Sequence, residues 1–266
     1  MTERLDAALA ARGLARSRTH AATLISLGVV SVDGRPVVKA ALRVAADQQI
    51  TVASADHYVS RAAHKLIAGL DGFGLDVSDR LALDLGASTG GFTQVLRERG
   101  AREVLAVDVG HGQMDPTIAG DPGVVVVEGF NARYMTSELL AEASGRSESP
   151  SVITGDLSFI SLTHILPAVG EVATTDSDVI LLVKPQFEVG RTAVKGGLVT
   201  DPIARVDAVE RVLWTAWDQG FGIRGFLASP LVGTHGNAEY IVHLAPGHEV
   251  DPSEWSGTVN RLAGSR

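Results

Sequence analysis

Apolar residues between positions 81 and 245 gather into short runs that are separated by polar and glycine-rich stretches. The first five runs are almost continuously apolar, which is typical of strands buried on both faces of a parallel sheet. Helical stretches lie between them, so we expect an α/β domain with a doubly wound, Rossmann-like sheet of about seven strands. The predicted strands are 81–85, 103–109, 123–129, 151–157, 178–185, 223–230 and 239–245.

The beginning of the chain follows a different pattern. Apolar positions in 3–12 recur at helical spacing until Gly13, and Ser17 is placed to cap a second helix. The stretches VVSVDGRPV and QQITVAS predict a small antiparallel sheet, with Asp33 and Gly34 in a hairpin turn. We therefore predict a small α+β domain over 1–56, a short linker over 57–60 and a large domain over 61–266.

Composition narrows the range of functions. The chain has no cysteine and no apolar run long enough for a membrane helix, and MTERLDAALAARG lacks the apolar core of a secretory signal. We therefore expect a cytoplasmic protein without disulfides. The net charge of −8 is uneven, since residues 1–65 hold nine basic and five acidic residues while 66–266 hold fourteen and twenty-six. The basic N-terminal part is the candidate for binding a polyanion.

The segment LALDLGASTGGFTQVL predicts a strand, a glycine-rich turn and a helix. Doubly wound sheets bind nucleotides at such turns. Gly86, Gly90 and Gly91 permit a close approach of the backbone to a ligand. Asp108 follows Gly86 by 22 residues, at the end of the next predicted strand. A carboxylate there can accept hydrogen bonds from both ribose hydroxyls of an adenosine.

Asp84 favours one nucleotide over another. A carboxylate roughly 4 Å from a dinucleotide pyrophosphate would repel it by about 1 to 4 kcal/mol, whereas it attracts the sulfonium and ammonium groups of S-adenosylmethionine. GASTGG also lacks the spaced glycines of the dinucleotide motif. The sequence therefore favours S-adenosylmethionine over a nicotinamide cofactor. The candidate cofactor contacts are Asp84, Gly86, Ser88, Gly90, Gly91, Phe92, Asp108, Asn131 and Asp156.

Four charged residues lie at or beside the ends of predicted strands. Lys65 lies on a helix expected to begin after a cap at Ser60. Asp156 and Lys184 end the fourth and fifth predicted strands, and Glu239 opens the last one. Active sites of open parallel sheets form at the carboxyl ends of the strands, so these side chains are candidates for one site. Taken singly, each is equally well explained as a surface charge or half of a structural ion pair.

A family resemblance is carried by the segments GLARSRTHAATLISLGVVSVDGRPVVK, VSRAAHKL, LDLGASTGGFT, AVDVGHGQ, DLSFISL, LVKPQFEVG and GNAEY. The first resembles the S-four RNA-binding module. The others resemble the TlyA-type ribosomal RNA methyltransferases, which are similar to FtsJ-like 2′-O-methyltransferases and are also labelled haemolysins. The resemblance implies that a Lys-Asp-Lys-Glu tetrad, here Lys65, Asp156, Lys184 and Glu239, methylates cytidine 2′-hydroxyls in small- and large-subunit ribosomal RNA. It also implies that the N-terminal module docks on the ribosome or its subunits.

The chemistry of the reaction agrees with this tetrad. A ribose hydroxyl is a poor nucleophile at neutral pH, so methyl transfer needs a base or strong orientation. A buried lysine between carboxylates can accept or steer the proton. We assign this role to Lys184, expect Asp156 and Glu239 to set its charge, and expect Lys65 to bind the phosphate or ribose. No metal is expected, because no histidine cluster has ligand spacing.

Contacts to RNA are expected from basic side chains near the second predicted helix and from arginines of the large domain. A solvated basic face is the alternative for the N-terminal charges. Phe159 is expected to hold a target base that has left its stack, with a core phenylalanine as the alternative. The candidate RNA contacts are Arg4, Arg12, Arg16, Arg18, Lys39, Arg61, Arg133, Phe159 and Arg191.

Two other functions stay open from the sequence. The chain could be a non-catalytic RNA-binding protein whose sheet is a degenerate methyltransferase scaffold. It could also be a membrane-lytic haemolysin, although no segment has the length or polarity to span a bilayer. We expect ribosomal RNA or ribosomal subunits as partners, no membrane and no metal, and a monomer as the simplest oligomeric state.

Overall fold

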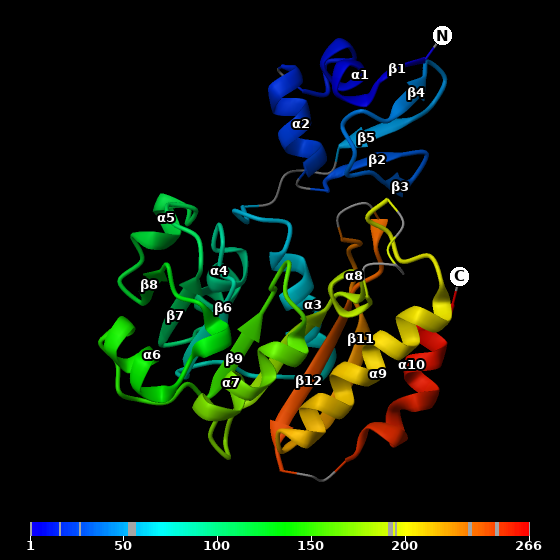
Figure 1. Ribbon diagram of the computed structural model, residues 1–266. Helices are drawn as coiled ribbons and strands as arrows, with labels where there is room; N and C mark the ends of the chain where they lie inside the picture. The colour runs from blue at the N-terminus through cyan, green and yellow to red at the C-terminus, as the bar shows by residue number, and fades with distance from the viewer. Residues whose placement is uncertain are drawn as a thin grey trace. The chain divides into compact units, whose positions relative to one another are not determined.

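The computed structural model describes residues 2–15, 17–26, 28–52, 57–190, 194, 196–233, 236–247 and 250–265. Contacts divide the chain into a smaller unit built on Met1–Arg61 and a larger unit built on Ala62–Gly233 and Asn237–Arg266. Each unit has a hydrophobic core of its own. The fold class expected from the sequence, a doubly wound α/β domain preceded by a small α+β domain, is confirmed (Figure 1).

The smaller unit packs two helices on short antiparallel strands. Asp33 and Gly34 both have positive φ, as the predicted hairpin turn requires. The amide of His20 donates to Ser17 Oγ over 3.1 Å, which confirms Ser17 as a cap. The elements are β1 (Thr2–Arg4), α1 (Leu5–Ala11), α2 (Arg18–Ser26), β2 (Val30–Val32), β3 (Arg35–Pro36), β4 (Arg43–Ala45) and β5 (Ile50–Val52).

The first predicted helix begins later than expected. Residues Thr2–Arg4 form β1, which pairs antiparallel with β4. The helical spacing is real, because Leu5, Ala8 and Leu9 of α1 are all buried in the small core. Pairing with β4, which is distant in sequence, therefore holds residues 2–4 in an extended conformation, and the helix begins only after them.

The larger unit is built on one seven-stranded sheet with the order β11-β12-β10-β9-β6-β7-β8. The strands β6 to β10 run parallel to one another, whereas β12 is antiparallel to both β10 and β11. All seven predicted strands are therefore present. They are β6 (Leu81–Leu85), β7 (Glu103–Asp108), β8 (Val124–Glu128), β9 (Val152–Gly155), β10 (Asp178–Val183), β11 (Phe221–Ala228) and β12 (Tyr240–Pro246).

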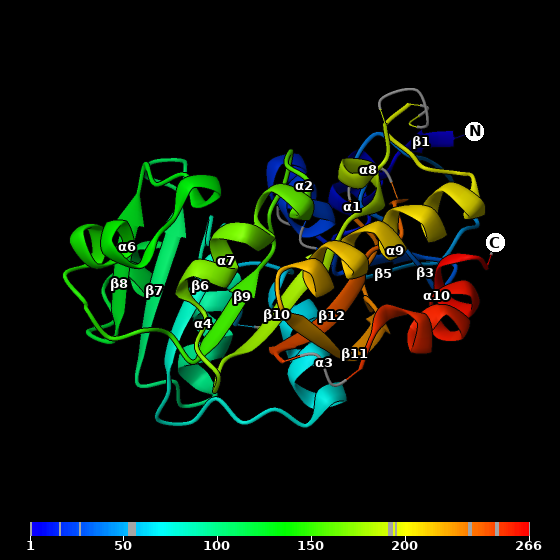
Figure 2. The same cartoon turned by 60° about the horizontal axis from the view of Figure 1, so that its bottom comes forward.

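Helices cover both faces of this sheet. Figures 1 and 2 show α7 and α9 on one face and α3 and α4 on the other. None of the helices within the described residues is long and apolar enough to cross a bilayer. The helices are α3 (Ala63–Phe73), α4 (Gly91–Glu98), α5 (Pro116–Ala119), α6 (Ser137–Ser144), α7 (Leu166–Val172), α8 (Pro185–Glu188), α9 (Pro202–Asp218) and α10 (Ser256–Ala263), with short 3₁₀ turns η1 (Ala132–Tyr134), η2 (Leu162–His164) and η5 (Pro252–Trp255).

The cap predicted at Ser60 is wrong. The helix that carries Lys65 begins at Ala63, its cap residue is Ala62, and no side chain caps it. It ends at Gly74 in a left-handed conformation, as the glycines in the sequence suggested. Lys65 lies on this helix, in its first turn.

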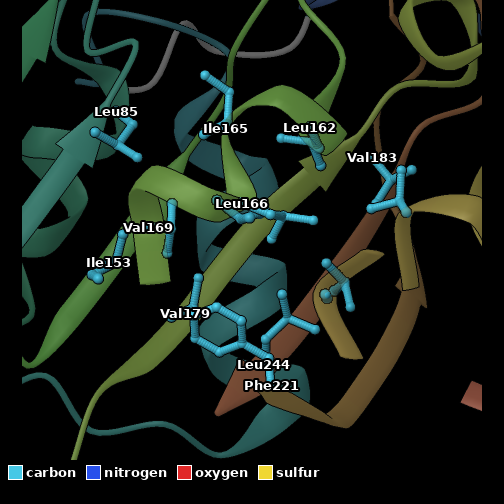
Figure 3. Packing of buried hydrophobic residues seen from close by; sticks show 14 of the residues in the cluster. Leu85, Ile153, Leu162, Ile165, Leu166, Val169, Val179, Val183, Phe221 and Leu244 are labelled. Atoms are coloured by element: carbon cyan, nitrogen blue, oxygen red, sulfur yellow. The ribbon is translucent and has the colours of Figure 1, made fainter. Parts of the chain in front are cut away.

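The core between the sheet and α7 fixes the strands whose ends form the site. Leu166 and Val169 of α7 lie over Ile153 of β9 and Val179 of β10 (Figure 3). Burying each such side chain stabilises the fold by about 1.5 to 3 kcal/mol. The residues that follow β9 and β10 therefore leave a rigid support at the same edge of the sheet.

Candidate active site

The glycine-rich turn between β6 and α4 has the backbone that its sequence predicts. Gly86, Ser88 and Gly90 all have positive φ. A Cβ at Gly86 would lie 3.2 Å from the Leu157 side chain and 3.5 Å from the Asp156 carbonyl oxygen. A Cβ at Gly90 would lie 2.6 Å from Met114 Sδ. Glycine is therefore required here for both conformation and packing.

Asp108 is held at the end of β7 by this turn and by the following loop. Its Oδ2 accepts from the Ser88 amide over 2.8 Å, and its Oδ1 accepts from the Gly110 amide over 2.7 Å. Each carboxylate oxygen retains further capacity to accept a hydrogen bond. The side chain is therefore fixed in orientation while it stays able to receive hydroxyl groups.

A cavity of about 580 Å³ opens beside Asp108. Its wall combines polar groups from the turn with apolar side chains from the loops after β7, β8 and β9. The lining residues are Gly86, Ser88, Val107, Asp108, Val109, Gln113, Phe130, Asn131, Ala132, Asp156, Leu157, Ser158, Phe159, Ile160 and Ile165. Five predicted cofactor contacts, Gly86, Ser88, Asp108, Asn131 and Asp156, thus lie on one cavity wall.

The other predicted cofactor contacts lie behind that wall. Asp84 is 1% exposed and accepts hydrogen bonds from Thr93 Oγ1 (2.7 Å) and Thr154 Oγ1 (3.1 Å). Burial raises the pKa of Asp84 to about 6, against the opposing effect of these hydrogen bonds. Phe92 is buried in α4, at whose start Gly90 and Gly91 lie. These residues therefore support the glycine-rich turn from inside the domain and do not line the cavity.

Gln113 is a cavity residue that the sequence analysis missed. Its Oε1 accepts from Ser88 Oγ over 3.2 Å, so it connects the glycine-rich turn with the loop after Asp108. The only signal for it was its place in the segment AVDVGHGQ. The apolar side chains of Phe130 and Ile165 were also missed, because loop side chains show no periodic pattern that tells which way they point.

The four candidate catalytic residues meet at the carboxyl edge of the sheet. Lys65 Nζ lies 2.5 Å from Glu239 Oε2 and 3.4 Å from Asp156 Oδ2. Lys184 Nζ lies 2.8 Å from Asp156 Oδ1 and 3.0 Å from Ser158 Oγ. The charges therefore alternate along a chain in the order Glu239, Lys65, Asp156, Lys184. Both lysines and Glu239 are buried, so each charge depends on its neighbours.

Asp156 is the centre of this network. Burial acts to raise the pKa of Asp156, but the ammonium groups of Lys65 and Lys184 outweigh it and hold that pKa below its usual value. Asp156 is therefore ionised at neutral pH. Because Glu239 contacts Lys65, its influence on Lys184 passes through Lys65 and Asp156, which differs from the direct role expected from the sequence. Lys65, which the sequence analysis expects to bind the phosphate or ribose, is buried.

Phe159 lies on the rim of the cavity with 92% of its surface exposed. The alternative of a core phenylalanine is therefore wrong. Its ring faces that of Phe187 with 5.3 Å between centroids. Arg133, the other predicted RNA contact described in this unit, is exposed on η1, with its guanidinium 5.7 Å from the Tyr134 ring centroid.

The predicted RNA contacts of the smaller unit are partly engaged in internal bonds. Arg4 and Arg18 both pair with Asp6, at 2.9 Å and 3.2 Å. Arg12 donates to the carbonyl oxygens of Gln48 and Ala45. Lys39 is exposed, and Arg61 ends the segment Met1–Arg61 of this unit. The predicted contacts Arg16 and Arg191 lie outside the described residues.

Within the described part of the chain, no group of three or more His, Asp or Glu residues is arranged to hold a metal ion. The described polar groups that line the cavity are instead amides, hydroxyls and carboxylates, and the Lys184 ammonium contacts two of the lining residues, Asp156 and Ser158. Such groups suit a ligand that carries hydroxyls and positive charge.

A nucleotide-type turn, a carboxylate at the next strand end and a buried charged network together define a Rossmann-type transferase. The family model of FtsJ-like methyltransferases matches residues 58–245, and that of the S4 domain matches residues 3–50. The chain therefore belongs to the FtsJ-like methyltransferase family and carries an S4 domain at its N-terminal end.

Relatives with the same organisation are found in several bacteria. The "16S/23S rRNA (cytidine-2'-O)-methyltransferase TlyA" of Mycobacterium tuberculosis is 48% identical over 91% of this chain and 89% of its own length. "Hemolysin A" of Brachyspira hyodysenteriae is 38% identical over 91% and 99%. A solved structure from Streptococcus thermophilus that carries a hemolysin description is 34% identical, covers 99% of this chain and 96% of its own, and has a TM-score of 0.75.

Proposed function

We propose that this protein uses S-adenosylmethionine to methylate the ribose 2′-hydroxyl of cytidine in ribosomal RNA. The observation that carries the proposal is the buried chain of Glu239, Lys65, Asp156 and Lys184, which reaches the same cavity as Asp108. A degenerate, non-catalytic scaffold would have no reason to keep four charges buried at this edge. The 48% identity to a relative named as an rRNA (cytidine-2′-O)-methyltransferase supports the same substrate.

The cavity suits S-adenosylmethionine as the methyl donor. Its volume of about 580 Å³ lies within the range of small-molecule sites. Gly86 lines the cavity, and Asp108 presents two fixed oxygens that can accept from ribose hydroxyls. Asn131 stands on the same wall, where it can contact the adenine. When bound, S-adenosylmethionine supplies a methyl group made electrophilic by its sulfonium.

Lys184 acts on the hydroxyl that receives the methyl group. Its Nζ is fixed between Asp156 and Ser158. As an ammonium it can donate to the 2′-oxygen and orient it, and as a neutral amine, after releasing its own proton to solvent, it can accept the proton that this oxygen loses. Asp156 contacts both lysines and balances their charge. Glu239 fixes Lys65 on the other side of Asp156. The whole network thereby holds the Lys184 amino group in a defined position beside the cavity.

Binding of the RNA is divided between the two units. The S4 domain carries the basic side chains that attract phosphates, among them Lys39, Arg4 and Arg18, and ribosomal subunits in the cytoplasm are its partner. In the larger unit, Phe159 offers an exposed ring on which a base that has left its stack can rest. Arg133 offers a guanidinium on the same unit for a phosphate.

Two measurements test the proposal. Ribose methylation mapped across ribosomal RNA from cells with and without this protein should differ at defined cytidines, and identical maps would reject the substrate. Calorimetry with the purified protein should show binding of S-adenosylmethionine. Asp108→Ala should weaken it by about 1 to 3 kcal/mol through loss of charge-assisted hydrogen bonds. Unchanged affinity in that variant would place the donor elsewhere.

A further inference from the structure

Phe159 has a backbone conformation that phenylalanine rarely adopts. Its φ of +65° lies in the left-handed region, where a side chain with a Cβ is strained. Its ring is also 92% exposed, so little apolar burial compensates for the strain. Residues in such conformations persist only when the surrounding structure holds them. The contacts on both sides of Phe159 therefore decide whether its ring stays at the cavity rim.

The loop is tied down on both sides of Phe159. On one side, Ser158 Oγ accepts from Lys184 Nζ over 3.0 Å. On the other side, the carboxylate of Glu188 accepts from the Leu162 amide over 2.8 Å and from the hydroxyl of Ser161. Glu188 thus binds two consecutive residues of the segment that follows the strained position.

Glu188 is well placed to act as an anchor. It is 7% exposed at the end of α8, and its backbone carbonyl accepts from Arg211 of α9 over 2.9 Å. The residue before it, Phe187, provides the ring that faces Phe159. Because α9 packs on the sheet, α8 links the loop to the rigid part of the unit.

We propose that Glu188 is a positioning residue that holds Phe159 at the cavity rim for the target nucleotide. Glu188 makes no contact with the reacting groups and acts through Ser161 and Leu162. The proposal rests on the proposed function, since it needs Phe159 to meet the RNA. Because Leu162, one of the two residues that Glu188 bonds, belongs to the hydrophobic core, the variants below are compared only as folded proteins.

Three variants separate hydrogen bonding from charge and from folding. Glu188→Ala removes both bonds to the loop. Glu188→Gln can still accept from the Leu162 amide and can donate to Ser161 Oγ, so it should rescue the loop. Ser161→Ala removes one bond and leaves the other. Glu142→Ala is the control, because Glu142 is an exposed glutamate on α6.

The first readout is single-turnover methylation of ribosomal subunits as a function of their concentration. Glu188→Ala should raise the half-saturating concentration at least about tenfold, the scale of losing buried hydrogen bonds. Glu188→Gln and Glu142→Ala should stay within about threefold of the parent protein, with Ser161→Ala between them. The affinity for S-adenosylmethionine, measured by calorimetry, should not change in any of them. Equal RNA dependence in a folded Glu188→Ala protein would overturn the proposal.

A double-variant cycle tests whether Glu188 acts through the ring. In a Phe159→Ala background, adding Glu188→Ala should change the RNA dependence by less than about twofold, because residues acting through one element are not additive. A full additional tenfold loss would show that Glu188 acts by another route and would overturn the proposal.

A third readout needs no RNA and stays valid if the proposed function fails. Chymotrypsin cleaves after exposed aromatic residues only when the backbone can unfold locally. Cleavage between Phe159 and Ile160, followed by mass spectrometry, should be at least about tenfold faster in Glu188→Ala than in the parent and the Glu142→Ala control. Equal cleavage rates in Glu188→Ala and the parent protein would show that Glu188 does not anchor this loop. An absence of methylation by the parent protein would reject the proposed function alone.

Discussion

The two edges of the large sheet carry charged networks on the same strands, and the networks differ in kind. At the amino edge of β10, Asp178 pairs with Arg80 at 2.7 Å and with His243 of β12 at 2.8 Å. At its carboxyl edge, Lys184 follows β10 and Glu239 precedes β12, and both belong to the chain of charges around Asp156. Similar residue types thus stand at both ends of two neighbouring strands.

The difference lies in what satisfies the cations. Arg80 donates to the carbonyl oxygens of Asp76, Asp176 and Ser151 as well as to Asp178. These bonds tie loops to the sheet. At the carboxyl edge the two lysines are held mainly by carboxylate side chains, and the network meets a cavity. A cation held by backbone carbonyls stabilises the fold, whereas one held beside a cavity can act on a substrate.

The largest expected effect is at Lys184. Lys184→Ala should cut the single-turnover methylation rate at least about a hundredfold, the usual scale for losing an acid–base group. Lys184→Arg should fail as well, because a guanidinium stays protonated and its planar fork does not fit the place of an ammonium. The rate is measured with ribosomal subunits at saturating donor, and thermal unfolding is followed in parallel. Near-normal turnover in a well-folded Lys184→Ala protein would remove this lysine from the mechanism.

The next effect concerns Gly233, which packs against the Glu239 carboxylate. A Cβ at position 233 would overlap Glu239 Oε1 and lie 2.8 Å from its Cδ. Gly233→Ala should therefore displace Glu239 from Lys65 and lower the methylation rate at least about tenfold. Gly257→Ala is the matched control, because a Cβ there meets nothing within 4 Å. If both alanine variants are equally active, the position of Glu239 does not matter for turnover.

At the amino edge the expected effect is on stability. Arg80→Ala should lower the free energy of unfolding by about 1 to 3 kcal/mol, because several backbone carbonyls lose their donor and Asp178 keeps only His243 as a partner. The side chains of Arg80 and Asp178 are 23% and 24% exposed, so screening by water limits the loss of stability. Denaturant unfolding measures the change, and the methylation rate below the melting temperature should stay within about twofold. A strong loss of methylation rate in folded Arg80→Ala protein would show that the network at the amino edge also contributes to catalysis.

The smallest effect is a contrast in pH dependence. Burial acts to raise the pKa of Asp178, but hydrogen bonds from His243 and Arg80 hold it below its usual value. Its contribution to stability is therefore present above about pH 4 and is lost as the pH falls further. The pKa of Asp84 is raised to about 6, so its effect on stability has the opposite sign. The free energy of unfolding contributed by this group falls as the pH rises from about 4 to 6.

Unfolding free energies measured from pH 3 to 7 check both signs. Asp178→Asn should flatten the profile below about pH 4, and Asp84→Asn should flatten it between about pH 4 and 6. Identical slopes for all three proteins would show that neither group titrates differently in the folded state.

Most of the strands could be predicted from the sequence, because strands that are buried on both faces are almost continuously apolar. Runs such as LALDL and VILLV have no regular polar alternation, since both faces of their strands are buried. The place of β12 was not predictable, because it lies between β10 and β11 and runs antiparallel to both. Strand order depends on pairings between distant segments, which local pattern does not record.

The site was predictable in its residues but not in its pairings. Strand ends and glycines marked the four charged residues and Asp108. The bond between Lys65 and Glu239 joins residues 174 positions apart, and only the sheet order brings them together. Asp84 lies in a strand whose neighbours Leu83 and Leu85 face the core, so alternation turns its carboxyl towards Thr93 of α4. The only signal for Glu188 was its place in the segment LVKPQFEVG, because its bonds to Ser161 and Leu162 join residues distant in sequence.

The most direct test of the account uses the purified protein with labelled S-adenosylmethionine and ribosomal subunits from cells that lack it. Nucleosides released from the RNA are separated and identified by mass spectrometry for the parent protein, Arg80→Ala and Lys184→Ala. The account predicts label on the ribose 2′-oxygen of cytidine for the first two proteins and none above background for the third. Label on a base, or equal 2′-O-methylcytidine from Lys184→Ala, would contradict it.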